Sequence, residues 1–243
     1  MLAVITYVSS DFLEVCYTFF SFYTSYHNIP ANDIYVIRFL NNRVDKCLDQ
    51  YNPTIIDTAN KFDDRFKTSL LMTLQRKLLA TYKFVLISDL DERFLPTPTM
   101  YRNIYEFLTH KQKTTTQPFI AAFGWEVLPA SNPINWSRPL LMQRQQMARL
   151  CGMDKPVLSR VPLKYTFSTH SVVGFNAFSC GDRLHSDINL YNIHLKCIDL
   201  YLWKHKGVLD TDRKGDNITF YITQRCLRKQ NYIKKIPKIL KVL

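Results

Sequence analysis

The spacing of apolar and polar positions predicts alternating strands and helices over the first ninety residues. Short apolar runs predict strands at 3–8, 34–40, 54–56 and 84–87. One helix is expected after Asp11, which can cap it, and another opens at Asp63 or Asp64, where Leu70, Leu74 and Leu78 recur every four residues. Strands that are joined through helices form a parallel sheet with right-handed crossovers.

The pattern is less regular beyond residue 90. It predicts a helix around 104–108, a strand at 119–128, extended chain over 157–173 and a strand at 190–195. From residue 199 onward the chain is expected to be mainly helical. The predicted fold class is therefore α/β, a mostly parallel sheet flanked by helices. We divide the chain into a domain at 1–205 and a basic helical extension at 206–243 that packs on the same domain.

Three carboxylates follow the most apolar strand. The run 84–87 is apolar throughout, as in a strand buried on both faces, and Asp89, Asp91 and Glu92 follow it. The carboxyl end of such a strand is the edge at which α/β sheets bind ligands. Asp89 and Asp91 are expected to point to the same side of an extended chain. Two carboxylates suit Mg²⁺ or Mn²⁺, although an acidic turn after a strand is the alternative.

Composition narrows the function classes. The 243 residues carry a net charge of +12, which attracts polyanions. Basic residues are spread along the chain and no nucleic-acid signature is present, so nucleic acid is not an expected partner. Six glycines and no glycine-rich phosphate loop exclude the dinucleotide and P-loop fingerprints. The basic segment 225–241 is either a solvated terminal element or a peripheral membrane contact.

Location is predicted from what the sequence lacks. There is no signal-peptide pattern, no apolar run long enough to span a membrane and no C-x-x-C pair among the six cysteines. The expected location is cytoplasmic, with the cytoplasmic face of the membrane as the alternative.

Segments in a fixed order carry a resemblance to a known group of enzymes. They are 74–82 leading into 84–96, then 123–127, 135–144, 155–157 with His170, and 193–199. In this order they resemble GT-A glycosyltransferases of the family 2 type, near the set that also resembles family 92. The resemblance covers roughly residues 1–205, and it implies a Rossmann-like GT-A domain there.

The resemblance implies a metal-dependent, inverting transfer of a sugar. The donor would be a nucleotide sugar, and the acceptor a hydroxyl group of a glycan, a lipid-linked molecule or a protein. Asp89 and Asp91 match the motif that holds the donor pyrophosphate through Mn²⁺ or Mg²⁺, with Asp91 on the metal and Asp89 on the ribose or on the metal through water. His194 is the candidate for a further metal ligand, and His170 is the second choice.

Further residues receive roles from the same resemblance. Lys155 and Tyr7 are assigned to the donor side, and Trp136 and Arg138 to the acceptor side. Glu126 is the first candidate for the base that takes the acceptor proton, with Glu92 as its rival. The nucleoside side departs from the family, because segment 37–42 has no acidic residue and the first strand lacks the usual Asn-Glu pair.

Two other classes of function compete with this interpretation. An apolar strand followed by D-x-D also opens haloacid-dehalogenase-type phosphatases, in which Asp89 would be the nucleophile and Asp91 the acid. Against it, Arg93 stands where that motif has Thr or Val, and Asp89 lies a third of the way along the chain. The other competitor is a non-catalytic basic binding module, which steep salt-dependent binding to nucleic acid would support.

Overall fold

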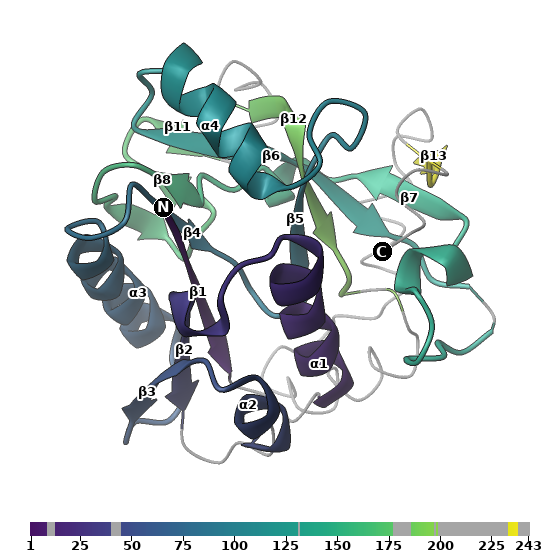
Figure 1. The fold of residues 1–243 in the computed structure, drawn as a ribbon, viewed down its shortest axis with the longest axis horizontal. Coiled ribbons are helices and arrows are strands. Elements are labelled where there is room, and N and C mark those ends of the chain that lie inside the picture. Colours follow the sequence, from purple (N-terminus) through teal and green to yellow (C-terminus); the bar gives the residue numbers. More distant parts are fainter. Residues whose placement is uncertain are drawn as a thin grey trace.

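The computed structural model describes residues 1–8, 13–39, 45–130, 132–176, 186–196, 198 and 233–237. Within them the first half of the chain builds a parallel sheet (Figure 1). Its strands are β1 (Leu2–Val8), β2 (Ile34–Phe39), β3 (Thr54–Thr58) and β4 (Phe84–Ile87), in the spatial order β3-β2-β1-β4. All three pairings are parallel. The carboxyl ends of these strands therefore meet at one edge.

The second half of the chain extends this sheet with mixed strands. β8 (Leu158–Ser159) lies antiparallel between β4 and β6 (Phe119–Val127). β12 (Ser186–His194) runs parallel to β6 and antiparallel to β5 (Glu92–Pro96). β7 (Gln146–Arg149) joins β6 to β13 (Ile233–Lys235). Three short strands, β9 (Tyr165–Phe167), β10 (Ser171–Val172) and β11 (Phe175–Asn176), form a separate sheet.

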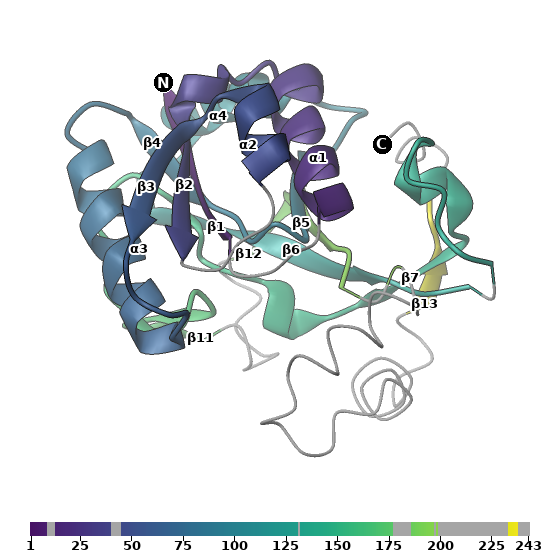
Figure 2. The same cartoon turned by 90° about the horizontal axis from the view of Figure 1, so that it is seen from below.

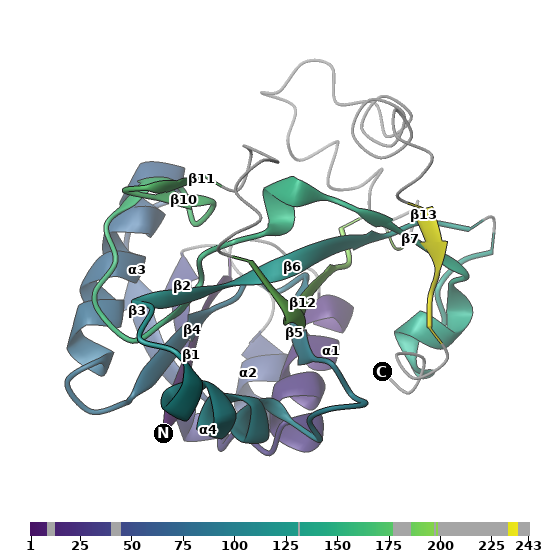
Figure 3. The ribbon, with the colours of Figure 1, turned by 90° about the horizontal axis from the view of Figure 1, so that it is seen from above.

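Helices cover both faces of the main sheet (Figures 2 and 3). α1 (Leu13–Ser21), α2 (Asp45–Tyr51) and α4 (Ile104–Thr114) lie on one face, and α3 (Asp64–Leu78) lies on the other. Local sequence sets their starts. Asp63 caps α3 by accepting the Phe66 N–H at 2.8 Å, and Asn103 caps α4 by accepting the Glu106 N–H at 3.1 Å. None of the helices in the described part of the chain is long and apolar enough to cross a membrane.

The predicted α/β architecture is confirmed, including the parallel strands, joined through helices, that lead into the carboxylates. α2, β5 and β7 were not predicted. The proposed extension at 206–243 lies outside the described residues except at 233–237. There the helix prediction is wrong, because Ile233–Lys235 forms a strand that pairs with β7. The boundary at residue 205 stays a prediction.

A buried histidine joins three elements on the helical face. His27 follows the π-helical turn Phe22–Tyr26 that extends α1, and it is fully buried. Its Nε2 lies 3.0 Å from the carbonyl oxygen of Phe94 in β5, and its Nδ1 accepts the Ile104 N–H of α4 at 3.2 Å. Because Nδ1 accepts, Nε2 carries the proton and donates, so the ring is neutral. Burial lowers the pKa of His27 to about 3.

This neutral histidine makes stability depend on pH. The unfolded chain binds a proton at His27 below about pH 6.5, whereas the folded chain does not until about pH 3. The contribution of His27 to the free energy of unfolding is therefore greatest above pH 6.5. It declines as the pH falls, by about 1.4 kcal/mol per pH unit. Between pH 4 and 6 the unfolding free energy of the unsubstituted protein should change more steeply with pH than that of His27→Gln. The difference in slope should correspond to about one proton bound on unfolding. Urea unfolding at several pH values measures it, and equal slopes would contradict the assignment.

Candidate functional site

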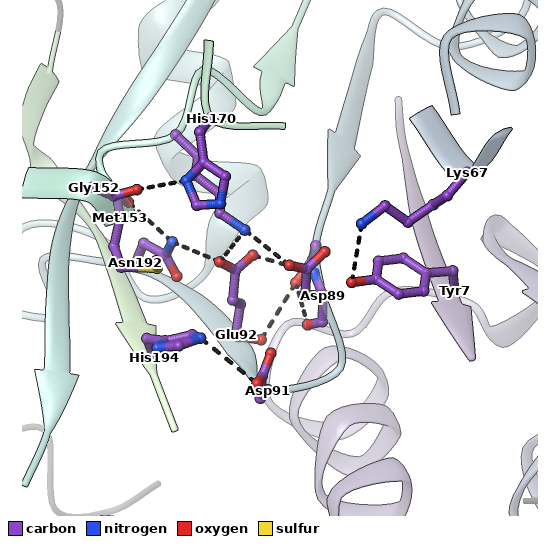
Figure 4. Close-up of polar contacts among 12 residues, drawn as sticks. Tyr7, Lys67, Asp89, Asp91, Glu92, Gly152, Met153, His170, Asn192 and His194 are labelled. Atoms are coloured by element: carbon purple, nitrogen blue, oxygen red, sulfur yellow. Dashed lines mark hydrogen bonds and ion pairs between the residues drawn. The ribbon is translucent and has the colours of Figure 1, made fainter. Parts of the chain in front are cut away.

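The carboxylates lie in a tight turn, not on an extended strand end. β4 stops at Ile87, and the Glu92 N–H donates to the Asp89 carbonyl at 3.0 Å, which closes the turn into β5. The Asp89 N–H in return donates to Glu92 Oε2 at 3.2 Å. The prediction that Asp89 and Asp91 share one side of an extended chain is therefore wrong. The turn instead brings Asp89 and Glu92 together, with Asp91 beside them (Figure 4).

Lys155 holds the two carboxylates of the turn. Its Nζ lies 2.9 Å from Asp89 Oδ2 and 2.7 Å from Glu92 Oε1, and the residue is 1% exposed. Lys155 lies on the segment that leads into β8. The backbone of this segment forms hydrogen bonds with both neighbouring strands, β6 and β4. The Lys155 carbonyl accepts the Ala122 N–H of β6, and the Val157 carbonyl accepts the Ile87 N–H of β4. The assignment of Lys155 to the donor side stays a prediction, but its position beside Asp89 is plain.

A close backbone approach fixes the segment that carries Lys155. A Cβ on Gly124 of β6 would lie 2.4 Å from the Cβ of Met153, so only glycine fits where the turn Cys151–Met153 packs on the strand. Asp154 Oδ1 accepts the Gly124 N–H at 2.7 Å. The other oxygen of Asp154 pairs with Arg149. Sequence reasoning had not singled out Gly124 for this contact.

The pKa shifts of the charged groups in the turn follow from the balance between burial and ion pairing. Burial works to raise the pKa of Asp89, but Lys155 and Lys67 outweigh it and its pKa is lowered. In Glu92 burial wins, assisted by the charge of Asp89, and its pKa is raised despite Lys155. Burial works to lower the pKa of Lys155, but Asp89 and Glu92 raise it. Lys155 is therefore charged at neutral pH.

A row across three strands positions His194. In the sheet register His194 of β12 lies opposite Glu92 of β5 and Glu126 of β6, so the three residues share one face. The His194 Nδ1 lies 2.5 Å from Glu126 Oε2, and its Nε2 lies 3.6 Å from Asp91 Oδ2. Burial opposes the charged ring, but Glu126 and Asp91 raise the pKa of His194. Glu126 itself is fully buried.

Asn192 and His170 lie on the same side of the carboxylate turn as His194 (Figure 4). Asn192 lies two residues before His194 on β12 and so on the same face. Its Nδ2 donates to Glu92 Oε1 at 3.2 Å and to the Met153 carbonyl at 3.0 Å. His170 Nδ1 lies 2.7 Å from the Gly152 carbonyl oxygen. Because a carbonyl only accepts, Nδ1 carries the proton and donates. Burial, with the charge of Lys155, lowers the pKa of His170 to about 3.

Tyr7 and Lys67 lie on the opposite side of the turn (Figure 4). The Lys67 ammonium lies 4.5 Å from the Tyr7 ring centroid and donates to the Tyr7 hydroxyl at 3.5 Å. It also pairs with Asp64 Oδ1 at 2.7 Å. Burial, reinforced by the charge of Asp89, raises the pKa of Tyr7. Sequence analysis named Tyr7 but missed Lys67, whose position on α3 follows a helical period and carries no motif.

The side chains of this site can supply only part of the ligand shell of a divalent cation. No cluster of three or more histidine, cysteine or acidic side chains that could hold a metal occurs within the described residues. Asp91 and His194 Nε2 still form a pair of one oxygen and one nitrogen ligand. Mg²⁺ and Mn²⁺ sites accept one or two protein carboxylates and complete their shell with water and substrate phosphates. The pair fits such a cation, whereas Asp89 is already paired with Lys155.

Trp136 and Arg138 do not join the carboxylate turn. They line a cavity with Arg93 of β5 and the outer side of α1. The structure therefore separates the predicted acceptor residues from the predicted metal residues. Of the segment 193–199 that belongs to the sequence resemblance, residues 193–196 and 198 are described, whereas 197 and 199 lie outside the described residues.

Among known proteins, this chain resembles only solved structures, and the resemblance is one of structure. No family model matches the chain, and no curated protein matches it. One similar solved structure is the mannosyltransferase PcManGT from Pyrobaculum calidifontis in complex with GDP-Man and Mn²⁺, at 11% identity and a TM-score of 0.30, covering 56% of this chain and 37% of that one. Another is TarS of S. aureus, at 10% identity and a TM-score of 0.30, covering 65% and 28%.

The extent of these alignments limits their use. The chain spans about a third of the length of each of the two proteins. Neither likeness assigns a family or an activity to it.

The buried charges give a direct test of the site. Lys155→Met leaves Glu92 and Asp89 without their cation, and we expect it to lower the unfolding free energy by about 3–5 kcal/mol. Adding Glu92→Gln removes one of the buried charges that Lys155→Met leaves without a partner, so the double variant should be more stable than Lys155→Met alone. Urea unfolding of the variants measures both effects. A double variant that is no more stable than the single one would contradict this account of the pair.

Proposed function

We propose that the protein is a metal-dependent glycosyltransferase that moves a sugar from a nucleotide-sugar donor to an acceptor hydroxyl, with inversion. One observation carries the proposal: Asp91, His194 and Glu126 form a chain of contacts at the carboxyl edge of β4. Metal-bound histidines characteristically donate their second nitrogen to a carboxylate, which fixes the ring and its tautomer. Glu126 is placed to do this for His194, and Nε2 is left directed at Asp91.

The metal ligands in this proposal are Asp91 and His194. A bound Mn²⁺ or Mg²⁺ would neutralise charge that develops on the leaving diphosphate. Asp89 and Lys155 belong to the donor side of the same turn. Lys155 offsets part of the charge of Asp89 and Glu92, which reduces their repulsion of a diphosphate. Tyr7 and Lys67 form the far wall, where Lys67 adds a second positive charge.

The transfer step exchanges one bond for another and releases one proton. The acceptor oxygen bonds to the anomeric carbon, and the bond from that carbon to the diphosphate oxygen breaks, its electron pair leaving with the diphosphate. The proton of the acceptor hydroxyl passes to a base. Glu126 and Glu92, the two bases predicted from sequence, have their carboxylates in buried contacts with His194 and Lys155. We therefore assign Glu126 to positioning His194.

Asp91→Asn tests the metal and the donor together. The folded protein should melt about 5 °C higher when a nucleotide sugar and Mn²⁺ are each present at about a hundredfold excess over Kd. We expect the variant to lose this shift, because an amide lacks the charge that holds the cation. Asp49→Asn, which changes an exposed carboxylate of α2, is the matched control and should keep it. A full shift and full transfer activity in Asp91→Asn would sink the proposal, and metal-dependent release of phosphate from phosphomonoesters would favour the phosphatase.

Glu126→Gln tests the positioning role. A neutral partner holds the His194 ring less firmly, so Mn²⁺ affinity should fall about tenfold or more, as when such supporting groups are removed elsewhere. Titration calorimetry with Mn²⁺ in the presence of a nucleoside diphosphate measures this directly. Glu14→Gln, an exposed change on α1, is the control. If Mn²⁺ affinity is unchanged while transfer is lost, Glu126 is the base that the sequence predicted.

A further inference from the structure

A cavity of about 520 Å³ lies beside β12, and none of the carboxylates of the turn is among its described lining residues. Ile193 and Leu195 line it, whereas His194 between them points to Glu126 and Asp91. Successive side chains on a strand point to opposite faces. Arg93 also lines the cavity and lies opposite Ile193 in the register of β5. The cavity and the carboxylate turn are therefore on opposite faces of the same strands.

The walls of the cavity combine aromatic rings with hydroxyl groups. Four aromatic residues on its lining are half-buried and so keep part of their surface open: Tyr17, Tyr26, Tyr51 and Trp136. Hydroxyl groups stand between them at Thr18, Ser21, Ser25 and Ser137. Apolar ring faces with a few polar groups, in a volume of this size, are typical of small-molecule sites. Sugar rings suit such walls, because they present C–H faces to aromatic rings and hydroxyls to polar groups.

The charge in the cavity is positive. Arg93 and Arg138 line it, and no aspartate or glutamate is among its described lining residues. Arg93 is only 5% exposed and donates to the Leu90 and Glu92 carbonyls and to Thr18 Oγ1. Its guanidinium makes no ion pair with a carboxylate in the described part of the chain. Asp91 and Glu92 act on this charge without an ion-pair contact, so an anion in the cavity would add a direct counter-charge.

The loop that carries Trp136 and Arg138 is held in place by its own hydrogen bonds. The Asn135 N–H donates to Gln143 Oε1 at 2.7 Å, and Gln143 Nε2 donates back to the Asn135 carbonyl at 2.8 Å. Asn135 Oδ1 also accepts from the backbone and the hydroxyl of Ser137. Arg144 then anchors the loop end by donating to the Ile198 carbonyl. The wall is preorganised, which reduces the entropic cost of binding.

We infer that this cavity binds an anionic saccharide, a sugar ring that carries a carboxylate or a phosphate. The binding does not rest on the proposed function, because the cavity and the carboxylate turn lie on opposite faces of the strands. The aromatic walls would hold the ring, and Arg138 with the buried charge of Arg93 would hold the anionic group. The Arg138 guanidinium matches both carboxylate and phosphate geometry. Arg93 contributes its charge, because its two terminal nitrogens already donate to protein acceptors.

Direct binding without donor or metal tests the inference. Titration calorimetry on the full chain would compare methyl glucuronide and glucose 6-phosphate with methyl glucoside, inorganic phosphate and decyl phosphate. We expect one or both anionic sugars to bind at least tenfold more tightly than the neutral sugar, the free phosphate and the alkyl phosphate. The two anionic probes separate a carboxylate ligand from a phosphate ligand.

Surface variants then locate the binding. Trp136→Ala and Arg138→Gln should each weaken binding of the anionic sugar at least tenfold. Arg102→Gln, which changes an arginine that is 90% exposed and outside the cavity, should leave it unchanged. Asp91→Asn should also leave it unchanged, because Asp91 is not part of the cavity. Loss of donor binding in that variant with retained sugar binding separates this inference from the proposed function.

Several outcomes would overturn the inference. Equal binding of methyl glucoside would remove the role of the anion, and equal binding of inorganic phosphate would remove the role of the ring. Tighter binding of decyl phosphate would identify a lipid site instead. Unchanged affinity in both Trp136→Ala and Arg138→Gln would place the ligand elsewhere, and no binding of either anionic sugar would leave the cavity without the ligand class inferred.

Discussion

The ammonium group of Lys155, buried between two carboxylates, is the constraint on which the site depends. Taking these charges out of water costs several kcal/mol per ion unless each keeps a close partner. Asp89 and Glu92 come from the turn after β4, whereas Lys155 comes from the segment before β8. The charges can be satisfied only when these segments meet. The packing of Met153 against Gly124 holds the second segment in place, so the geometry of the turn is fixed before any ligand arrives.

The period of a strand explains how one part of the sheet can support two different sites. Glu92, His194 and Glu126 form one row across β5, β12 and β6, and Arg93, Ile193 and Trp125 form the next. Adjacent rows face opposite sides of the sheet. The first row gathers carboxylates around a histidine, whereas the second places a guanidinium in an aromatic cavity. A shift of one residue in the register of β12 would exchange the two faces, so both sites depend on the same pairing.

The sequence predicted the parts of the fold that local pattern controls. Apolar runs and the four-residue spacing of α3 are local, and they were enough to place Asp89 and Asp91 at the carboxyl edge of a central strand. The tight turn was one of two alternatives, and the sequence did not decide between them, because D-x-D suits an extended end as well as a turn. The contact of Lys155 with Asp89 joins residues 66 positions apart, and β8 is only two residues long. Such pairings depend on tertiary structure and leave no period in the sequence.

Charge distinguishes the two faces and argues for different ligands on each. In the first cluster Asp89, Asp91, Glu92 and Glu126 are set against Lys155 and His194, so carboxylates are in excess within a protein of net charge +12. A local excess of buried negative charge favours a cation, and a diphosphate would be repelled there without one. The cavity on the other face has arginines and no acid among its described lining. A cation on one face and an anion on the other are the ligands that these opposite fields stabilise.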